Sequence, residues 1–133
     1  MANVSEVSIC NQALGWLGGN HITSLLDSST EGILCNANYA TLRDTVLEAS
    51  DWSFAMLRGV TGAPVLTPPA WGYANAFTLP AAMMRMIYVG QSARVEEDDP
   101  VPDWVMEGGM LLMNNSVGYF RGIQRITDPL KFT

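Results

Sequence analysis

Residues 3–19, NVSEVSICNQALGWLGG, and residues 28–55, SSTEGILCNANYATLRDTVLEASDWSFA, decide the fold expected of this chain. Each starts with a residue that can cap a helix and continues with apolar residues at helical spacing. In the first segment Asn3 and Glu6 are placed to form a capping box, and two consecutive glycines end the helix. The helix would bury a stripe made of Val7, Cys10, Leu14 and Leu17.

The second segment predicts a longer helix that must also bury an apolar face. Ser28, with Glu31 three positions later, can form a second capping box. Its apolar stripe consists of Tyr39, Leu42, Val46 and Ala49, with Ile33 and Ala40 beside it. We therefore expect a helical part over residues 1–58.

Three residues near the end of this part are expected to be structural anchors. Arg43 can reach Glu48 or a carboxylate on another element, and such pairs orient helices more than they stabilise them. Trp52 and Phe54 lie where the second helix ends, where large aromatic residues anchor a loop to the core or contact another subunit.

Residues 59–72 are rich in proline and glycine and predict a long exposed loop. Structureless stretches of this length are uncommon and tend to be functional. The apolar residues Val65, Leu66 and Trp71 within it indicate either docking to a partner or a cluster folded back on the core.

The remainder, residues 73–126, has the short alternating patterns of an antiparallel β part. A pair of strands is expected to flank Pro80, and a hairpin to turn at Gly108-Gly109 with a third strand after it. The expected strands cover residues 73–79, 86–89, 104–107, 110–113 and 117–123. With residues 127–133 as a C-terminal segment, the sequence predicts one domain over 1–133 of the α+β class, with helices first and a sheet insertion after them.

Composition limits the functions that are open to the chain. Of its 133 residues, 48% are hydrophobic and 15% charged, which favours a surface partly covered by partners. The net charge of −6 is the opposite of the basic footprint of a protein that grips nucleic acid. The absence of an apolar run long enough for a membrane span, and of a signal-peptide pattern, predicts a soluble protein made in the cytosol.

No group of residues predicts catalysis, a metal or a cofactor. The acidic run Glu96, Glu97, Asp98 and Asp99 lacks the order of an EF-hand, so we expect a solvated loop or an acidic rim that faces a lumen or a partner. His21 is the only histidine, lies at a predicted turn and is expected to be satisfied by backbone. Cys10 and Cys35 have no metal-ligand spacing and read as buried hydrophobic residues, although a disulfide between the two helices is geometrically possible.

Two further groups are candidates for contacts between subunits. Met83 and Met84 are consecutive, so both cannot face one core, and methionine adapts to irregular surfaces. Arg121, Arg125 and Lys131 make the C-terminal part positive, whereas the helices and the 96–99 loop are acidic. This polarity suits a head-to-tail contact between identical subunits, which joins two different patches and can close a ring.

Several of these stretches also match a known pattern in order and spacing. They are Ile9 to Gly18, Ile22 to Leu25, Tyr39 with Arg43-Asp44 and Leu47-Glu48, Trp52 to Ala55, Phe77 to Pro80, Arg85 to Val89, Trp104 to Leu112 and Tyr119 to Phe132. In these residues the chain resembles the tail tubular protein A-like head-to-tail adaptor proteins of tailed bacteriophages. It departs from them at Ala81, where an acidic residue is usual, and after Asp128-Pro129, where the family continues with further helices. We expect a shortened member, or a neighbouring subunit that supplies that packing.

The resemblance implies a structural protein that is not an enzyme and needs no cofactor. It implies a ring, a dodecamer if the family's habit holds, between the phage portal protein and the tail or nozzle proteins, in the neck of the virion. Double-stranded DNA would pass through the lumen without specific binding, and the host cytoplasm would hold the protein during assembly. Two alternatives stay open, which are a stopper or tail-completion protein of the neck, and a small ligand-binding or catalytic domain with its site under the 59–72 loop.

Overall fold

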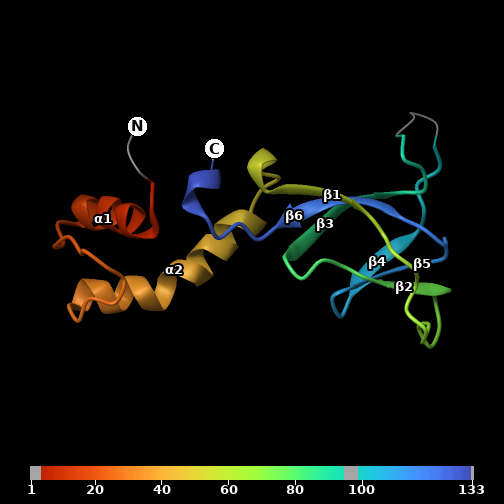
Figure 1. Ribbon diagram of the computed structural model, residues 1–133, viewed down its shortest axis with the longest axis horizontal. Helices are drawn as coiled ribbons and strands as arrows, with labels where there is room; N and C mark the ends of the chain where they lie inside the picture. The colour runs from red at the N-terminus through yellow and green to blue at the C-terminus, as the bar shows by residue number, and fades with distance from the viewer. Residues whose placement is uncertain (1–3, 95–98, 133) are drawn as a thin grey trace. The chain divides into compact units, whose positions relative to one another are not determined.

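The computed structural model describes residues 4–94 and 99–132 of an α+β protein (Figure 1). Two helices and two three-stranded antiparallel sheets form two compact units, which confirms the predicted fold class. The helical unit comprises residues 1–50 and 126–133, and the β unit comprises residues 51–125. The β unit is thus an insertion within the helical unit. Asn3, Glu96, Glu97 and Asp98 lie outside the described residues.

Helix α1 spans Glu6–Leu17, and its N-cap lies two residues later than the expected Asn3. Ser5 is the N-cap, and the capping box is closed by Ser8, because each serine side chain accepts a hydrogen bond from the other's backbone N–H. The prediction of a box with Glu6 is therefore wrong, since the hydroxyl of Ser8 already fills that role. At the other end Gly18 adopts a left-handed conformation, with φ 76°, and ends the helix as predicted.

Helix α2 spans Thr30–Glu48, and its cap lies one residue later than predicted. The hydroxyl of Ser29, not that of Ser28, accepts a hydrogen bond from the backbone N–H of Gly32 at 3.1 Å. Gly32 is required here, because a Cβ at this position would lie 2.6 Å from the carbonyl oxygen of Asp27. The chain before the cap is thus packed tightly against the first turn of the helix.

The first sheet has the strand order β1-β6-β3. Its strands are β1, Met56–Val60, β6, Tyr119–Gln124, and β3, Met83–Gly90. Strand β1 corrects two predicted boundaries, because it occupies the end of the expected helical part and the start of the expected 59–72 loop. It follows a short 3-10 helix, Ser53–Ala55, and it is held by pairing with β6 from the far end of the chain.

The second sheet has the order β2-β5-β4. Its strands are β2, Asn75–Thr78, β5, Met110–Met113, and β4, Trp104–Glu107. The predicted hairpin is confirmed, with Gly108 and Gly109 both at positive φ in a two-residue turn. The strands on either side of Pro80, β2 and β3, belong to different sheets, and β6 pairs with β1 and β3 instead of the hairpin.

One hydrophobic core lies between the two sheets of the β unit. The second sheet contributes Phe77, Leu111 and Met113, all fully buried. The first sheet and the turn before it contribute Leu79, Met83, Met86, Val89 and Phe120. The side of each sheet that faces away from this core is called its outer face below.

A second 3-10 helix, Pro129–Lys131, follows the last strand along the chain and belongs to the helical unit.

Candidate functional site

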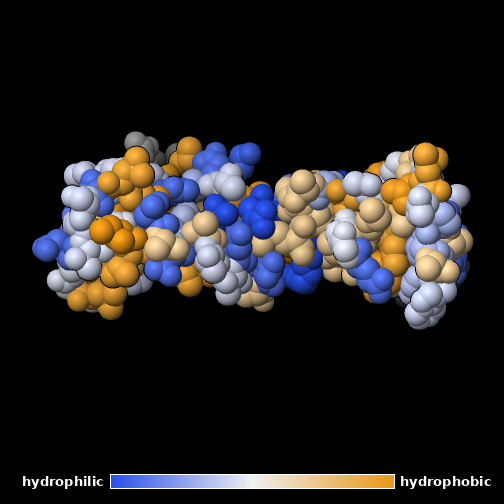
Figure 2. All heavy atoms as spheres, turned by 90° about the horizontal axis from the view of Figure 1, so that it is seen from below, coloured by the Kyte–Doolittle hydropathy of each residue, from blue (hydrophilic) through white to orange (hydrophobic). Residues whose placement is uncertain are grey.

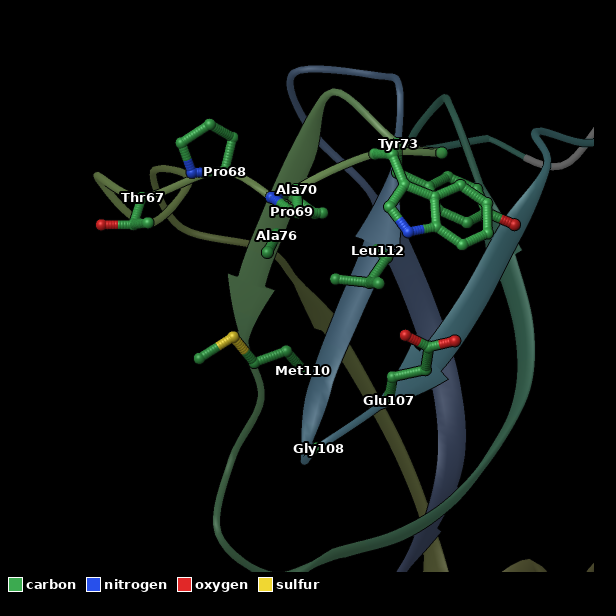
Figure 3. A pocket seen from close by; sticks show the side chains of 12 residues that line it. Thr67, Pro68, Pro69, Ala70, Tyr73, Ala76, Glu107, Gly108, Met110 and Leu112 are labelled. Atoms are coloured by element: carbon green, nitrogen blue, oxygen red, sulfur yellow. The ribbon is translucent and has the colours of Figure 1, made fainter.

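A depression lies on the outer face of the β2-β5-β4 sheet, under residues 67–73 (Figure 3). Leu111 and Phe77, which are paired in the sheet, face the core, so their neighbours Leu112 and Ala76, also paired, face outward. The loop covers these two side chains, and a volume of about 530 Å³ remains between the loop and the hairpin. The walls are mostly apolar, with Met110, Leu112 and the prolines of the loop around it.

The loop over the depression is tethered at both ends. The backbone N–H of Val65 donates to the carbonyl oxygen of Ala76 at 2.8 Å, and that of Ala74 donates to the side chain of Asn114 at 2.9 Å. Between these bonds the loop presents Leu66 fully exposed and Trp71 at 87% exposure. Of the three loop residues proposed to dock a partner, Val65 is thus half-buried, whereas Leu66 and Trp71 are exposed.

The side chains at the depression that carry polar groups are those of Thr67, Trp71, Tyr73 and Glu107 (Figure 3). One carboxylate beside aromatic rings is suited to an apolar or cationic group of a ligand. Within residues 4–94 and 99–132, no set of three His, Cys, Asp or Glu side chains is placed to hold a metal ion. Glu107 and Tyr73 were not predicted as site residues, although the outward position of Glu107 follows from the hairpin alternation.

The helical unit carries a second candidate site, an exposed apolar surface (Figure 2). Its buried hydrophobic residues among those described are Cys10, Ile22, Leu47 and Ile126. Exposure exceeds half for Trp16, Leu17, Leu26, Ile33, Leu34, Leu42 and Val46. The predicted burial of Leu17, Leu42 and Val46 is therefore wrong within a single chain, because hydrophobic side chains lie on several sides of the helices, and two helices with a short C-terminal segment cover only part of them.

A pair of thiols lies between the two helices. The pKa of the Cys10 thiol is raised from 9.0 to about 11. Burial is the largest cause, and a hydrogen bond with the Cys35 thiol and the charge of Cys35 add to it. Burial and the nearby charge of Glu6 also raise the pKa of Tyr39, whose hydroxyl lies in the same region without a hydrogen-bond partner among the described residues. Cys10 is buried, as predicted, and Cys35 is partly buried, both as free thiols.

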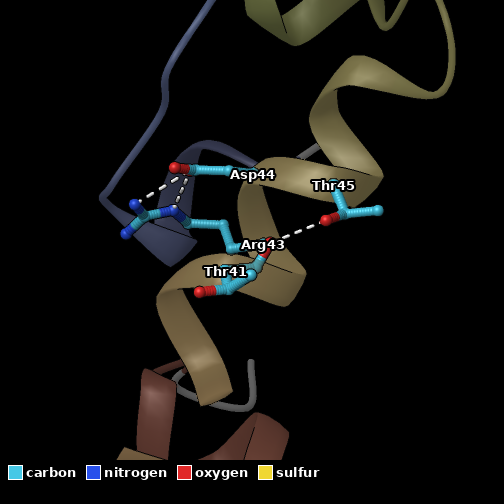
Figure 4. Close-up of polar contacts among 4 residues, drawn as sticks. All are labelled: Thr41, Arg43, Asp44 and Thr45. Carbon is cyan, nitrogen blue, oxygen red and sulfur yellow. Dashed lines mark hydrogen bonds and ion pairs between the residues drawn. The ribbon is translucent and has the colours of Figure 1, made fainter. Parts of the chain in front are cut away.

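Arg43 forms its ion pair with the adjacent residue (Figure 4). Its Nε and Nη2 atoms lie 3.0 and 2.9 Å from Oδ1 of Asp44, and its side chain is only 11% exposed. The expected partner, Glu48, is not used. The largely buried charge of Arg43 is thus neutralised by the carboxylate of Asp44 in the same helix. Its role as a structural anchor stays a prediction.

The other predicted residues are spread over both units. Met83 lies in the core of the β unit, whereas Met84 is half-buried, and the proposed role of both at an interface stays a prediction. Trp52 and Phe54 are half-buried and stacked, with ring centroids 5.8 Å apart. Arg121 lies on β6 and Arg125 directly after it, whereas Lys131 is exposed in the helical unit.

Two polar predictions remain from the loops. Asp99, the described member of the acidic run, accepts a hydrogen bond from the hydroxyl of Ser92 at 2.9 Å. His21 is exposed beside α1, 3.7 Å from where a Cβ on Gly15 would lie. His21 belongs to the helical unit and Asp99 to the β unit.

The chain matches no protein-family model and no curated protein. None of the helices in the described part of the chain is both long and apolar enough to cross a membrane.

Proposed function

We propose that this chain is a structural protein of a tailed bacteriophage, a head-to-tail adaptor that assembles with copies of itself into a ring. In this role the ring lies in the virion neck between the portal protein and the tail or nozzle proteins, and double-stranded DNA passes through it. The proposal starts from the resemblance in sequence, which sets the dodecamer as the expected assembly. It assigns the chain no enzymatic activity and no cofactor.

The observation that carries the proposal is the exposed apolar surface of the helical unit. Large hydrophobic side chains of this unit that are more than half exposed outnumber the buried ones. Patches of this kind mark contact with other proteins, because a soluble monomer rarely leaves so much apolar surface in water. A geometric role in an assembly accounts for this surface, whereas a catalytic role does not need it.

The net charge is compatible with a channel. With 13 acidic and 7 basic residues, the chain repels phosphate more than it attracts it. DNA that has to slide through a ring needs weak contacts, so an acidic protein suits this passage better than a basic one.

Negative-stain electron microscopy and light scattering of the purified protein test the proposal. Rings with a central hole are the expected result, and a strictly monomeric protein at micromolar concentration would contradict it. Leu42→Asp should abolish assembly, because it places a charge on the exposed apolar surface of α2. Ala63→Asp is the matched control, since Ala63 is an exposed residue outside the helical unit and the charge change is identical.

A second candidate function is the binding of a small ligand in the depression under the loop. It is favoured by the volume of about 530 Å³, which lies in the usual range for ligand sites, and by Glu107 at its edge. Binding would change the fluorescence of Trp71, and Trp71→Ala would remove that change.

A stopper or tail-completion protein of the same neck is distinguished from the adaptor by its neighbours in a reconstruction of the virion.

A further inference from the structure

The outer face of the β1-β6-β3 sheet carries a row of positive charge. On the core side, Leu57 is paired with Gly122, and Gly59 with Phe120. Arg58 and Arg121 alternate with these residues and are directly paired, so both point to the outer face. Tyr88 pairs with Arg121 from the other side and extends the row. We call Arg58, Arg121 and Tyr88 the basic row.

Within residues 4–94 and 99–132, no carboxylate neutralises the basic row. Neither Arg58 nor Arg121 has an ion-pair partner among the described residues, and the three strands of this sheet contain no acidic residue. The Nε atom of Arg121 is buried and donates no hydrogen bond to the described residues. Two like charges directly opposite in a sheet repel each other. A carboxylate from outside would relieve this repulsion and satisfy the guanidinium groups.

In the next row of the same face, the charge of an arginine is neutralised by a carboxylate of the chain. There Arg85 pairs with Ile123, and Nη2 of Arg85 lies 2.6 Å from a carboxylate oxygen of Asp51. Ile123 beside it is fully buried. Among the residues that the structure describes, none covers the row of Arg58 and Arg121 in this way, and Arg58 and Val60 are exposed at its edge.

We propose that the basic row docks the acidic, apolar helical unit of a second copy of this chain. The helical unit has six acidic and two basic residues, a net charge of −4, and its exposed apolar side chains lie among these acids. Arg and Tyr are the residue types that contribute most at protein interfaces, whereas a phosphate surface would need a broader basic footprint than an acidic protein offers. Two different patches meet in this contact, so repetition produces a ring or a filament. The inference rests on the proposed function and identifies the surfaces that would form its ring.

Two variants that each lose one surface test this contact. The first, Arg58→Glu with Arg121→Glu, loses the basic row and keeps the helical surface. The second, Leu42→Lys with Val46→Lys, loses the helical surface and keeps the row. Each variant alone should be monomeric, with self-association weakened about tenfold or more. A mixture of the two should form dimers with one chain of each kind and nothing larger, because only one intact contact remains.

Controls keep the outcomes separate. Arg94→Glu changes an exposed arginine outside the basic row by the same charge and should assemble like the wild type. Arg58→Glu alone changes only the exposed member of the row, so it tests the contact if the double variant does not fold. Circular dichroism of each variant verifies the fold.

Several results would overturn the inference. Normal rings from the arginine variants would leave the adaptor function intact but remove the basic row from its interface. A mixture that stays monomeric would show that the two surfaces do not meet. A monomeric wild-type protein would instead contradict the proposed function itself. Binding of wild-type protein to short duplex DNA that is lost in the arginine variants, with assembly unchanged, would assign the row to phosphate groups.

Discussion

The ring of Phe120 on β6 lies directly against Gly59 on the neighbouring strand β1. A Cβ at Gly59 would be 2.5 Å from Cζ of Phe120, a distance that the packed ring cannot accommodate. The absence of a side chain at Gly59 thus gives Phe120 its place in the core and fixes the register of β1 on β6.

Gly59→Ala is therefore expected to destabilise the β unit by about 1–3 kcal/mol, because overpacking forces the ring or the strand to move. Urea unfolding followed by tryptophan fluorescence measures the change. Gly62→Ala is the matched control, since a Cβ at Gly62 meets no atom within 4 Å and its φ is not positive. Equal unfolding midpoints for the two variants would disprove the close packing of Phe120.

Leu111→Ala should cost about 2–5 kcal/mol, because it opens a cavity between the two sheets where Leu111 is fully buried. The control is Leu66→Ala, which removes the same atoms from a fully exposed side chain and should change stability by less than about 0.5 kcal/mol. A large loss of stability in the control would mean that Leu66 is covered in solution by another copy or by the chain itself.

Asn11 holds the loop between the helices. Its side chain accepts a hydrogen bond from the backbone N–H of Ile22 at 2.7 Å and donates one to the carbonyl oxygen of Ile22 at 2.9 Å. Asn11→Ala should lower the free energy of unfolding of the helical unit by about 1–3 kcal/mol, because it leaves both backbone groups unpaired. Asn36→Ala, at an exposed position of α2, is the control. Hydrogen exchange at the Ile22 amide measures the effect locally, and unchanged protection would refute the role of Asn11.

The raised pKa of Cys10 predicts how its reactivity changes with pH. Because the thiolate is the nucleophile and the pKa in the folded protein is about 11, alkylation by iodoacetamide should be slow at pH 8 and rise about tenfold per pH unit toward pH 11. The same protein in urea, with a pKa near 9.0, should react faster at pH 8. Peptide mass spectrometry identifies the alkylated cysteine, and equal rates in the folded and unfolded states would contradict the prediction.

The same shift has a consequence for stability. A pKa that is raised in the folded state contributes stability that is complete below pH 9.0 and is lost as the pH rises through about 11. The raised pKa of Tyr39 acts in the same direction. The helical unit should therefore melt at lower temperature above pH 9, and Cys10→Ala should reduce this dependence. A melting temperature that does not change between pH 8 and pH 11 would show that neither group is desolvated.

Features set by neighbouring residues could be predicted from the sequence. The two helices end and begin within a few residues of the expected positions, and the Gly108-Gly109 turn has the predicted conformation, because capping and turn chemistry act over three or four residues. Strand β1 was missed because Met56–Val60 is short, contains Arg58 and Gly59, and is stabilised by pairing with distant β6. The division of six strands into two sheets depends on such distant pairs and has no local signal.

In the candidate sites, too, features set by neighbouring residues could be predicted, whereas features set by distant contacts could not. The exposure of Leu66 and Trp71 could be expected from a loop rich in proline and glycine. Met83 was assigned to a surface because methionine fits both cores and interfaces, and only the packing around it places it in the core. Arg121 was selected from charge alone, but its alignment with Arg58 and Tyr88 needs the strand register.

The discontinuity of the helical unit sets an order of events at the ribosome. Residues 1–50 emerge first, but Ile126, one of the few buried hydrophobic residues of that unit, is made only after all six strands. The strands can form their own core before that point, whereas the two helices still expose the apolar surface that Ile126 would cover. Chaperones are expected to bind this early segment during translation, and a premature stop before Ile126 should yield insoluble product even though the β unit is whole.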